Sequence, residues 1–159
     1  MVYEFIKEPK QMQYRELIAY ACSRSDAVMM VFPYEQNDAI RKGDVETIRK
    51  RLSPWRIKTR YDPQWPTTKN SDTTCNFYID LYNPSDEIKE FLLQINRLYG
   101  WRDSFPCDIS FFKNNYCWFA TCSHEQYGWV ITNTLLPLRY SEFLAIVEDP
   151  NDLTYYEEY

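Results

Sequence analysis

Residues 107–132 have the sequence CDISFFKNNYCWFATCSHEQYGWVIT, and this stretch decides the fold. Two short polar gaps, Asn114-Asn115 and Glu125-Gln126, interrupt it, and such gaps are typical of tight turns between paired strands. Around the gaps lie three runs rich in aromatic and β-branched residues, at Cys107–Lys113, Tyr116–Ser123 and Tyr127–Thr132. The stretch therefore predicts an antiparallel meander of three strands.

Three more strands are predicted upstream of the meander. Residues Ala27–Tyr34 are apolar on both faces and fit a buried strand. Residues Trp55–Tyr61 alternate aromatic, aliphatic or hydroxyl side chains with basic ones, which is typical of a half-exposed strand. Residues Cys75–Tyr82 alternate as well, and we expect the polar face that carries Asp80 and Tyr82 to contact water. The chain is thus expected to form about six strands.

Four helices are predicted from apolar residues that recur at the helical period. The third has boundary signals, with Asn83 as its N-cap, Pro84 at the first helical position and Gly100 at its end. The four helices are expected at Lys10–Arg24, residues 38–52, residues 83–100 and Ser141–Glu148.

One loop is also predicted from the sequence. The segment Asp62–Asp72 holds two prolines and several turn formers, so we expect a flexible loop there.

Length and element order together indicate the fold class. A chain of 159 residues with 45% apolar and 18% aromatic residues can bury one large core, so a single domain over residues 1–159 is expected. Runs of neighbouring strands replace the regular alternation of strand and helix that parallel sheets need. We therefore predict an α+β fold, with one mostly antiparallel, twisted sheet of about six strands and helices packed on one face.

Composition disfavours membrane, secreted and nucleotide-dependent proteins. The longest apolar run, Ala27–Pro33, is too short to span a membrane, and the N-terminus MVYEFIKEPKQ lacks an apolar signal segment. The three glycines form neither a phosphate-binding loop nor a dinucleotide fingerprint, so no cofactor is expected. Five cysteines, an odd set without CxxC spacing, fit free thiols in a reducing compartment. These features predict a cytoplasmic protein.

Charge is distributed unevenly along the chain. The net charge is −5, yet residues 41–60 carry eight Lys or Arg against two acids, which leaves −11 for the rest. The overall acidity argues against general nucleic-acid affinity. Residues 41–60 still offer an alternative, because cations beside aromatic rings can contact phosphates and stack bases of a single strand. That alternative would use Arg49, Arg51, Trp55, Arg56, Lys58 and Arg60, whereas the simpler interpretation is a solvated helix face followed by a charged edge strand.

His124 is the only histidine, and it is predicted at the end of a strand. Glu125 follows it, and Cys122 lies two residues before it on the same side of the strand. A cysteine nucleophile with a histidine base, or two ligands of a metal ion, would use this group. Structural zinc usually needs four ligands, so neither a catalytic nor a metal site is assigned. Cys117, an odd number of residues from Cys122, is expected on the opposite face of the strand.

Asp80 and Asp108 are the candidates for paired carboxylates. Acid–base chemistry would need both in one pocket. They lie on separate predicted strands whose register the sequence does not reveal. A structural role is the simpler interpretation of each.

The C-terminal residues 150–159 combine acidic and tyrosine side chains. Two interpretations stay open: a flexible terminus, or a segment that binds a protein partner with a basic surface. The residues that would bind such a partner are Asp152, Tyr155, Tyr156, Glu157, Glu158 and Tyr159.

One segment of the chain resembles a pattern found in small uncharacterised bacterial proteins. Residues 105–125, FPCDISFFKNNYCWFATCSHE, share with them a Pro-x-Asp strand followed by a Trp-containing strand that closes on Ser-His-Glu. The Tyr61–Pro66 loop and the Leu98–Trp101 segment are similar to the same pattern. This resemblance implies no established activity. In size, acidity and aromatic content the chain is also similar to cytoplasmic immunity proteins that neutralise bacterial toxins.

The leading functional hypothesis is a non-enzymatic, protein-binding protein, an immunity-type inhibitor of a bacterial toxin or effector. A small hydrolase or metal-dependent enzyme that uses His124 and Glu125 is the alternative. Single-strand nucleic-acid binding through residues 41–60 is a second alternative.

Overall fold

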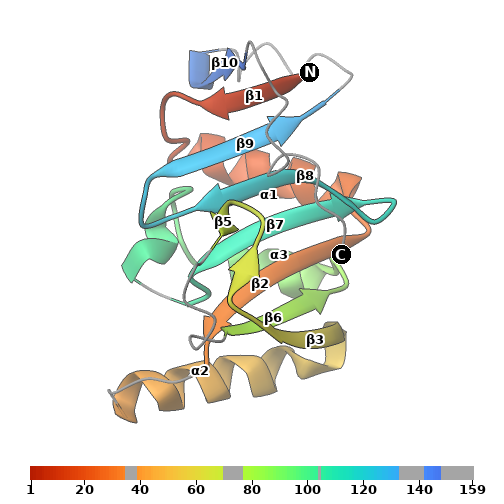
Figure 1. The fold of residues 1–159 in the computed structure, drawn as a ribbon, viewed down its shortest axis with the longest axis vertical. Helices are drawn as coiled ribbons and strands as arrows, with labels where there is room; N and C mark the ends of the chain where they lie inside the picture. The colour runs from red at the N-terminus through yellow and green to blue at the C-terminus, as the bar shows by residue number, and fades with distance from the viewer. Residues whose placement is uncertain (35–38, 70–76, 104, 133–141, 148–159) are drawn as a thin grey trace.

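A large antiparallel sheet dominates the computed structural model, which describes residues 1–34, 39–69, 77–103, 105–132 and 142–147 (Figure 1). Within these residues the sheet has eight strands: β1 (Val2–Phe5), β2 (Ala27–Pro33), β3 (Arg56–Asp62), β6 (Phe77–Tyr82), β7 (Asp108–Lys113), β8 (Tyr116–Cys122), β9 (Tyr127–Ile131) and β10 (Leu144–Ile146). Their spatial order is β10-β1-β9-β8-β7-β2-β6-β3. The predicted α+β class and antiparallel sheet are confirmed.

The predicted meander is present as β7, β8 and β9, each antiparallel to the next. Asn114 and Asn115 turn the chain between β7 and β8 with φ angles of 50° and 71°, in the left-handed region that asparagine tolerates. The Asp26 carboxylate accepts hydrogen bonds from the Asn114 backbone N–H and from the Lys113 ammonium, both at 2.9 Å. The turn is therefore fastened to the loop that precedes β2.

A β-bulge in β8 changes the direction of one predicted side chain. Phe111 lies opposite Phe119 and Phe112 lies opposite Cys117, so Trp118 is an extra residue on its strand. The extra residue breaks the alternation of side chains, and Cys117 joins the same core cluster as Ala120. Cys122 follows Ala120 by two residues and shares its face, so the prediction that Cys117 and Cys122 lie on opposite faces was wrong.

The sheet has two strands more than the six expected, because both ends of the chain contribute one. β1 pairs with β9 on one side and with β10 on the other. Residues 144–146 were predicted to be helical, but they are extended and pair with Tyr3–Phe5. Backbone pairing with a distant segment therefore outweighs the helical spacing of these few residues.

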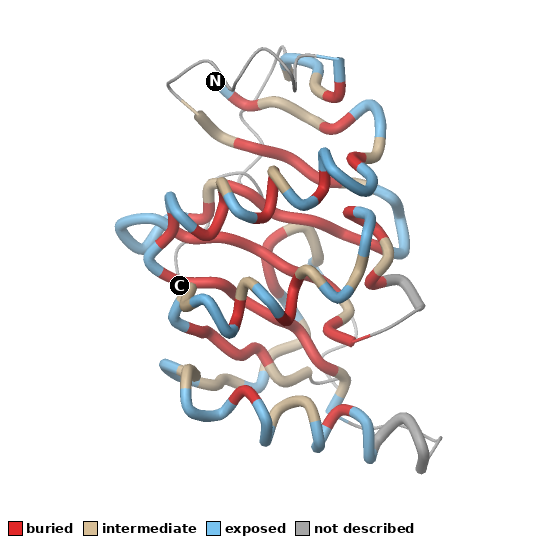
Figure 2. The backbone as a smooth tube through the Cα atoms, turned by 180° about the vertical axis from the view of Figure 1, so that it is seen from behind, coloured by how far each residue is buried: buried red, intermediate tan, exposed pale blue. Residues whose placement is uncertain are grey.

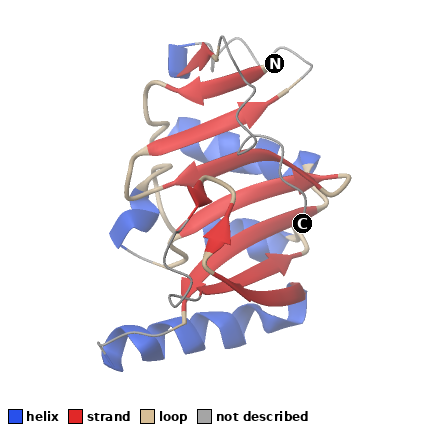
Figure 3. Cartoon of the chain, viewed as in Figure 1, coloured by secondary structure: helices blue, strands red, loops and turns tan. Residues whose placement is uncertain are grey.

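Three α-helices accompany the sheet: α1 (Met12–Arg24), α2 (Ala39–Leu52) and α3 (Asp86–Leu92). α1 and α3 lie on one face of the sheet, and α2 runs along the edge of the sheet that β3 forms (Figure 3). The view from behind shows the buried sides of these helices turned toward the buried strands (Figure 2). Tyr14, Val45 and Ile88, one from each helix, belong to the same core cluster as Met30 and Phe119 of the sheet.

α3 begins later and ends earlier than the sequence predicted. Its N-cap is Ser85, whose hydroxyl accepts a hydrogen bond from the Ile88 N–H, and not Asn83. The helix ends at Leu92 and not at Gly100. The backbone after it finds partners outside the helix, since Leu98 N–H donates to the carbonyl of Pro9. A short 3₁₀ helix, Gly100–Asp103, follows.

The other face of the sheet carries a small hairpin, β4 (Gln64–Trp65) with β5 (Thr68–Lys69), drawn in front of the strands in Figure 1. It lies in the segment predicted to be a loop, of which residues 70–72 lie outside the described part. Trp65 is buried in a second core cluster with Met29 and Leu81. Burial of this tryptophan thus holds the hairpin against the sheet. Among the described helices, none is long and apolar enough to cross a membrane.

The polar face of β6 is buried, contrary to prediction. Asp80 and Tyr82 are both inaccessible to solvent. They lie on the face covered by the helices, where Arg49 of α2 reaches over Asp80. The alternating pattern correctly placed the side chains on two faces, but it did not reveal that a helix covers the polar one.

Candidate functional site

Asp108, Cys122 and His124 come together at one end of the sheet. Asp108 begins β7, Cys122 ends β8, and His124 lies in the turn that follows. Because β7 and β8 are antiparallel, the start of one meets the end of the other. One ligand-type atom from each of the three side chains lies within 4.8 Å of the others. The sequence had linked Cys122 with His124, and the structure adds Asp108.

His124 connects the buried part of this cluster to the surface. Its Nδ1 lies 3.5 Å from the Cys122 Sγ, and its Nε2 lies 3.7 Å from a carboxylate oxygen of Glu125. The His124 side chain is 66% exposed, whereas Cys122 is 1% exposed. The imidazole therefore stands between a buried thiol and a surface carboxylate.

Asp108 is held in place by two hydrogen bonds. One carboxylate oxygen accepts from the Trp65 indole N–H at 2.8 Å, and the other accepts from the Ser123 backbone N–H at 2.7 Å. Burial raises the pKa of Asp108 to about 6, although both hydrogen bonds favour its ionised form. The carboxyl group is thus fixed in orientation, and its negative charge is only partly compensated.

Cys122 does not have the properties of a nucleophile. Burial, together with the nearby carboxylates of Asp108 and Glu125, raises the pKa of its thiol to about 11. A reactive cysteine needs a lowered pKa and access to substrate. The geometry therefore does not favour the cysteine hydrolase considered from the sequence, whereas three ligand-type groups around one point suit a cation.

Asp80 and Asp108 are not brought together. In the register of the sheet, Asp80 lies opposite Met30 and Asp108 lies opposite Val31. Neighbouring residues of a strand point to opposite faces, so the two carboxylates lie on different sides of the sheet. Acid–base catalysis by this pair is therefore not supported by the geometry.

Asp80 instead forms a buried ion pair with Arg49. The Arg49 guanidinium donates to both carboxylate oxygens, at 2.6 and 2.8 Å. The Thr59 hydroxyl donates to one of these oxygens at 2.6 Å, and the Tyr82 hydroxyl donates to the other at 2.9 Å. Arg49, a candidate for nucleic-acid contact, is thus engaged inside the protein.

The remaining basic residues of β3 do not form one surface with Arg49. Thr59 points toward Asp80, so by alternation Lys58 and Arg60 point to the other face of the strand. Arg60 also lies 3.8 Å from the carboxylate of Asp62. Arg56 lies at the other end of β3 and is half-buried. A continuous cationic track for a nucleic-acid strand is not formed by these residues.

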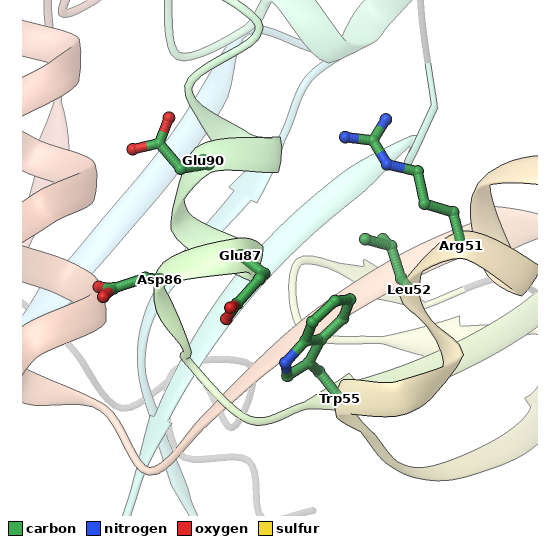
Figure 4. A pocket seen from close by; sticks show the side chains of 6 residues that line it. All are labelled: Arg51, Leu52, Trp55, Asp86, Glu87 and Glu90. Carbon is green, nitrogen blue, oxygen red and sulfur yellow. The ribbon is translucent and has the colours of Figure 1, made fainter.

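Arg51 and Trp55 line an open groove between α2 and α3. The groove has a volume of about 340 Å³. Figure 4 shows Glu87 on the side of α3 that faces Trp55, whereas Asp86 points away. The Glu87 carboxylate therefore lies on the side of the aromatic ring, which does not suit a base stacked next to a phosphate. The residues that line the groove are Arg51, Leu52, Trp55, Asp86, Glu87 and Glu90.

Three tyrosines form a partly exposed cluster near the C-terminal end of β3. Tyr34, Tyr61 and Tyr78 contact one another with ring centroids 5.1 to 5.6 Å apart. Tyr34 is 42% exposed and Tyr61 is 62% exposed. The Arg49 guanidinium lies 3.5 Å from the centroid of the Tyr78 ring. Sequence analysis missed this tyrosine cluster, because its members come from three separate segments of the chain.

The predicted partner-binding residues at the C-terminus, within 150–159, lie outside the described residues, and their role stays a prediction. No family model, no curated protein and no solved structure matches the chain, so function is argued from its own residues and geometry.

Proposed function

We propose that this chain is a non-enzymatic, protein-binding protein, an immunity-type inhibitor of a bacterial toxin or effector. The tyrosine cluster of Tyr34, Tyr61 and Tyr78 is the observation that carries the proposal. Tyrosine is enriched among the residues that dominate binding energy in protein interfaces, since it combines a large apolar surface with a hydroxyl group. A group of three such rings, of which Tyr34 and Tyr61 are exposed, is suited to be the centre of an interface.

The tyrosine cluster is also preorganised for binding. Tyr78 packs against the main core, and Arg49 is fixed over its ring by the ion pair with Asp80. Tyr34 and Tyr61 meet this ring edge to face or tilted, which limits their motion. Little side-chain entropy would be lost when a partner covers rings that are already ordered.

Charge supports a partner with a basic surface. The chain has a net charge of −5, so a basic partner is attracted from a distance. At the tyrosine cluster the charges of Arg49 and Asp80 compensate each other. Residues 41–60, which include most of α2 and β3, carry a net charge of +6, so the long-range attraction comes from the rest of the chain, whose net charge is −11. The faces of the tyrosine rings attract cations such as the guanidinium of arginine.

The test compares three tagged proteins as baits in extracts of the host. They are the wild type, the double variant Tyr34→Ala/Tyr61→Ala, and a control, Tyr116→Ala, which removes an exposed tyrosine from the distant β7–β8 hairpin. We expect one stoichiometric basic protein to bind the wild type and the control. The double variant should lose at least about thirtyfold in affinity for it, or about 2 kcal/mol.

An activity assay with the purified partner then tests whether binding inhibits it. The wild type should suppress the toxicity or enzymatic activity of the partner at equal molar amounts, and the double variant should not. The proposal fails if no stoichiometric protein is recovered with the wild type, or if the double variant binds and inhibits as well as the control.

A further inference from the structure

We propose that Asp108, Cys122 and His124 form a binding site for a zinc-class divalent metal ion and supply three of its ligands. The three residues offer a carboxylate oxygen, a thiolate sulfur and an imidazole nitrogen, which are the ligand types that zinc binds in proteins. They reach one point from two strands and the turn between β8 and β9. This site lies on the face of the sheet opposite the tyrosine cluster and does not depend on the proposed function.

The distance between the Cys122 sulfur and the His124 nitrogen matches the requirements of a tetrahedral ion. A thiolate sulfur about 2.3 Å and an imidazole nitrogen about 2.0 Å from zinc lie roughly 3.5 Å from each other in that geometry. The Cys122 Sγ and the His124 Nδ1 are 3.5 Å apart. The Asp108 carboxylate is within 4.8 Å of both, so a small approach would bring its oxygen into the coordination sphere. The cluster is thus close to its metal-bound geometry.

The surroundings hold each ligand as metal sites require. A histidine that binds a metal usually donates its other ring N–H to a carboxylate, which fixes its orientation. A carboxylate oxygen of Glu125 lies 3.7 Å from the His124 Nε2, and a small rotation of the Glu125 side chain would let it accept this hydrogen bond. The Trp65 indole and the Ser123 N–H orient Asp108 through one oxygen each, and every carboxylate oxygen can accept more than one partner.

The ligand types indicate which metal would bind. A divalent ion that binds here displaces the proton of the Cys122 thiol, so that the sulfur binds as a thiolate while His124 binds as a neutral imidazole. The ion then compensates the charges of this thiolate and of the Asp108 carboxylate. Thiolate together with imidazole favours zinc, cobalt or similar ions over magnesium and calcium, which prefer oxygen ligands.

Cobalt(II) is the probe for this site, because a tetrahedral cobalt–thiolate complex has visible and near-ultraviolet absorption bands. The full-length protein, reduced and free of metal, is titrated with CoCl₂ in a non-chelating buffer. We expect the bands to saturate at one equivalent of cobalt and to disappear when zinc displaces it. The absence of these bands in the wild type at one equivalent would overturn the proposal.

Variants separate this site from adventitious binding. His124→Ala removes an exposed side chain, so folding should be preserved, and it should weaken cobalt binding at least about tenfold. Cys122→Ser should abolish the thiolate-to-cobalt band. Cys107→Ser changes a half-buried cysteine that precedes Asp108 but packs against the core on the helix side of the sheet, and it should retain the band. If Cys122→Ser does not fold, the cobalt affinity of His124→Ala still tests whether the ion binds at this site. Unchanged cobalt affinity in His124→Ala would show that the ion binds elsewhere.

Discussion

Asp80 shows how a single residue can reverse its expected role. Asp80 lies on the same face of its strand as Tyr78 and Tyr82. The sequence predicts that this face contacts water, yet Asp80 is fully buried. Four hydrogen bonds from three side chains satisfy its carboxylate. The alternating pattern correctly assigned Asp80 to one face of the strand. It did not reveal that α2 covers this face, because Arg49 of that helix is 31 residues away in the chain.

Removal of the charge at Asp80 should therefore destabilise the protein strongly. Asp80→Asn leaves the partly buried guanidinium of Arg49 without its counter-charge, and we expect a loss of about 3 kcal/mol in the free energy of unfolding. Urea denaturation followed by circular dichroism measures it. Asp44→Asn, on the exposed side of α2, is the control and should change stability by less than about 0.5 kcal/mol. Equal effects of the two substitutions would contradict a structural ion pair.

The Asp108–Cys122–His124 cluster was partly predictable from the sequence. Cys122 and His124 are two residues apart, so their proximity follows from strand geometry alone. Asp108 joins them only through the pairing of β7 with β8 across a hairpin that contains a bulge at Trp118. A register that includes a bulge cannot be counted from turn positions, so the sequence alone does not bring Asp108 to the other two residues.

At the scale of elements, clear turn and strand patterns located the central strands of the sheet. The short strands from the two ends of the chain have no such pattern and were not predicted. β7, β8 and β9 were predicted within two residues because turn residues separate alternating runs. β1 and β10 were missed because strands of four and three residues are too short to show alternation. Their pairing is between opposite ends of the chain, and no local pattern encodes it.

The start of α3 provides a test of an element boundary. Asn83 and Ser85 both have side chains suited to capping, and only the Ser85 hydroxyl accepts a hydrogen bond from the helix, from the Ile88 N–H at 3.3 Å. Ser85→Ala should reduce the free energy of unfolding by about 1 kcal/mol. Asn83→Ala, at an exposed residue outside the helix, should have little effect. Thermal and urea unfolding of the two variants will distinguish them, and a larger loss for Asn83→Ala would restore the boundary predicted from the sequence.

At the scale of the whole molecule, the eight-stranded sheet separates two sets of residues. The face covered by α1, α2 and α3 carries the Arg49–Asp80 pair and the tyrosine cluster at its end. The opposite face carries the hairpin β4–β5 and the cluster around Asp108. The proposed binding surface and the proposed metal site therefore lie on different faces and can be altered independently. Loss of cobalt binding in His124→Ala should leave binding of the protein partner unchanged.

Net charge gives the last prediction, which rests on the proposed function. Residues 150–159 contribute three acids, so their deletion changes the net charge from −5 to −2. Because long-range attraction mainly sets the association rate, the truncated protein should bind the basic partner about tenfold more slowly at low salt. At 0.15 M salt, where the screening length falls to about 8 Å, the difference should narrow.

Surface plasmon resonance at several salt concentrations measures these rates. If the segment acts through charge alone, the dissociation rate and the melting temperature of the truncated protein should match those of the full chain. A faster dissociation would assign direct contacts to Tyr155, Tyr156 and Tyr159, since contact residues act mainly on dissociation. An association rate that is unchanged at low salt would refute a role for the acidic segment in attracting the partner.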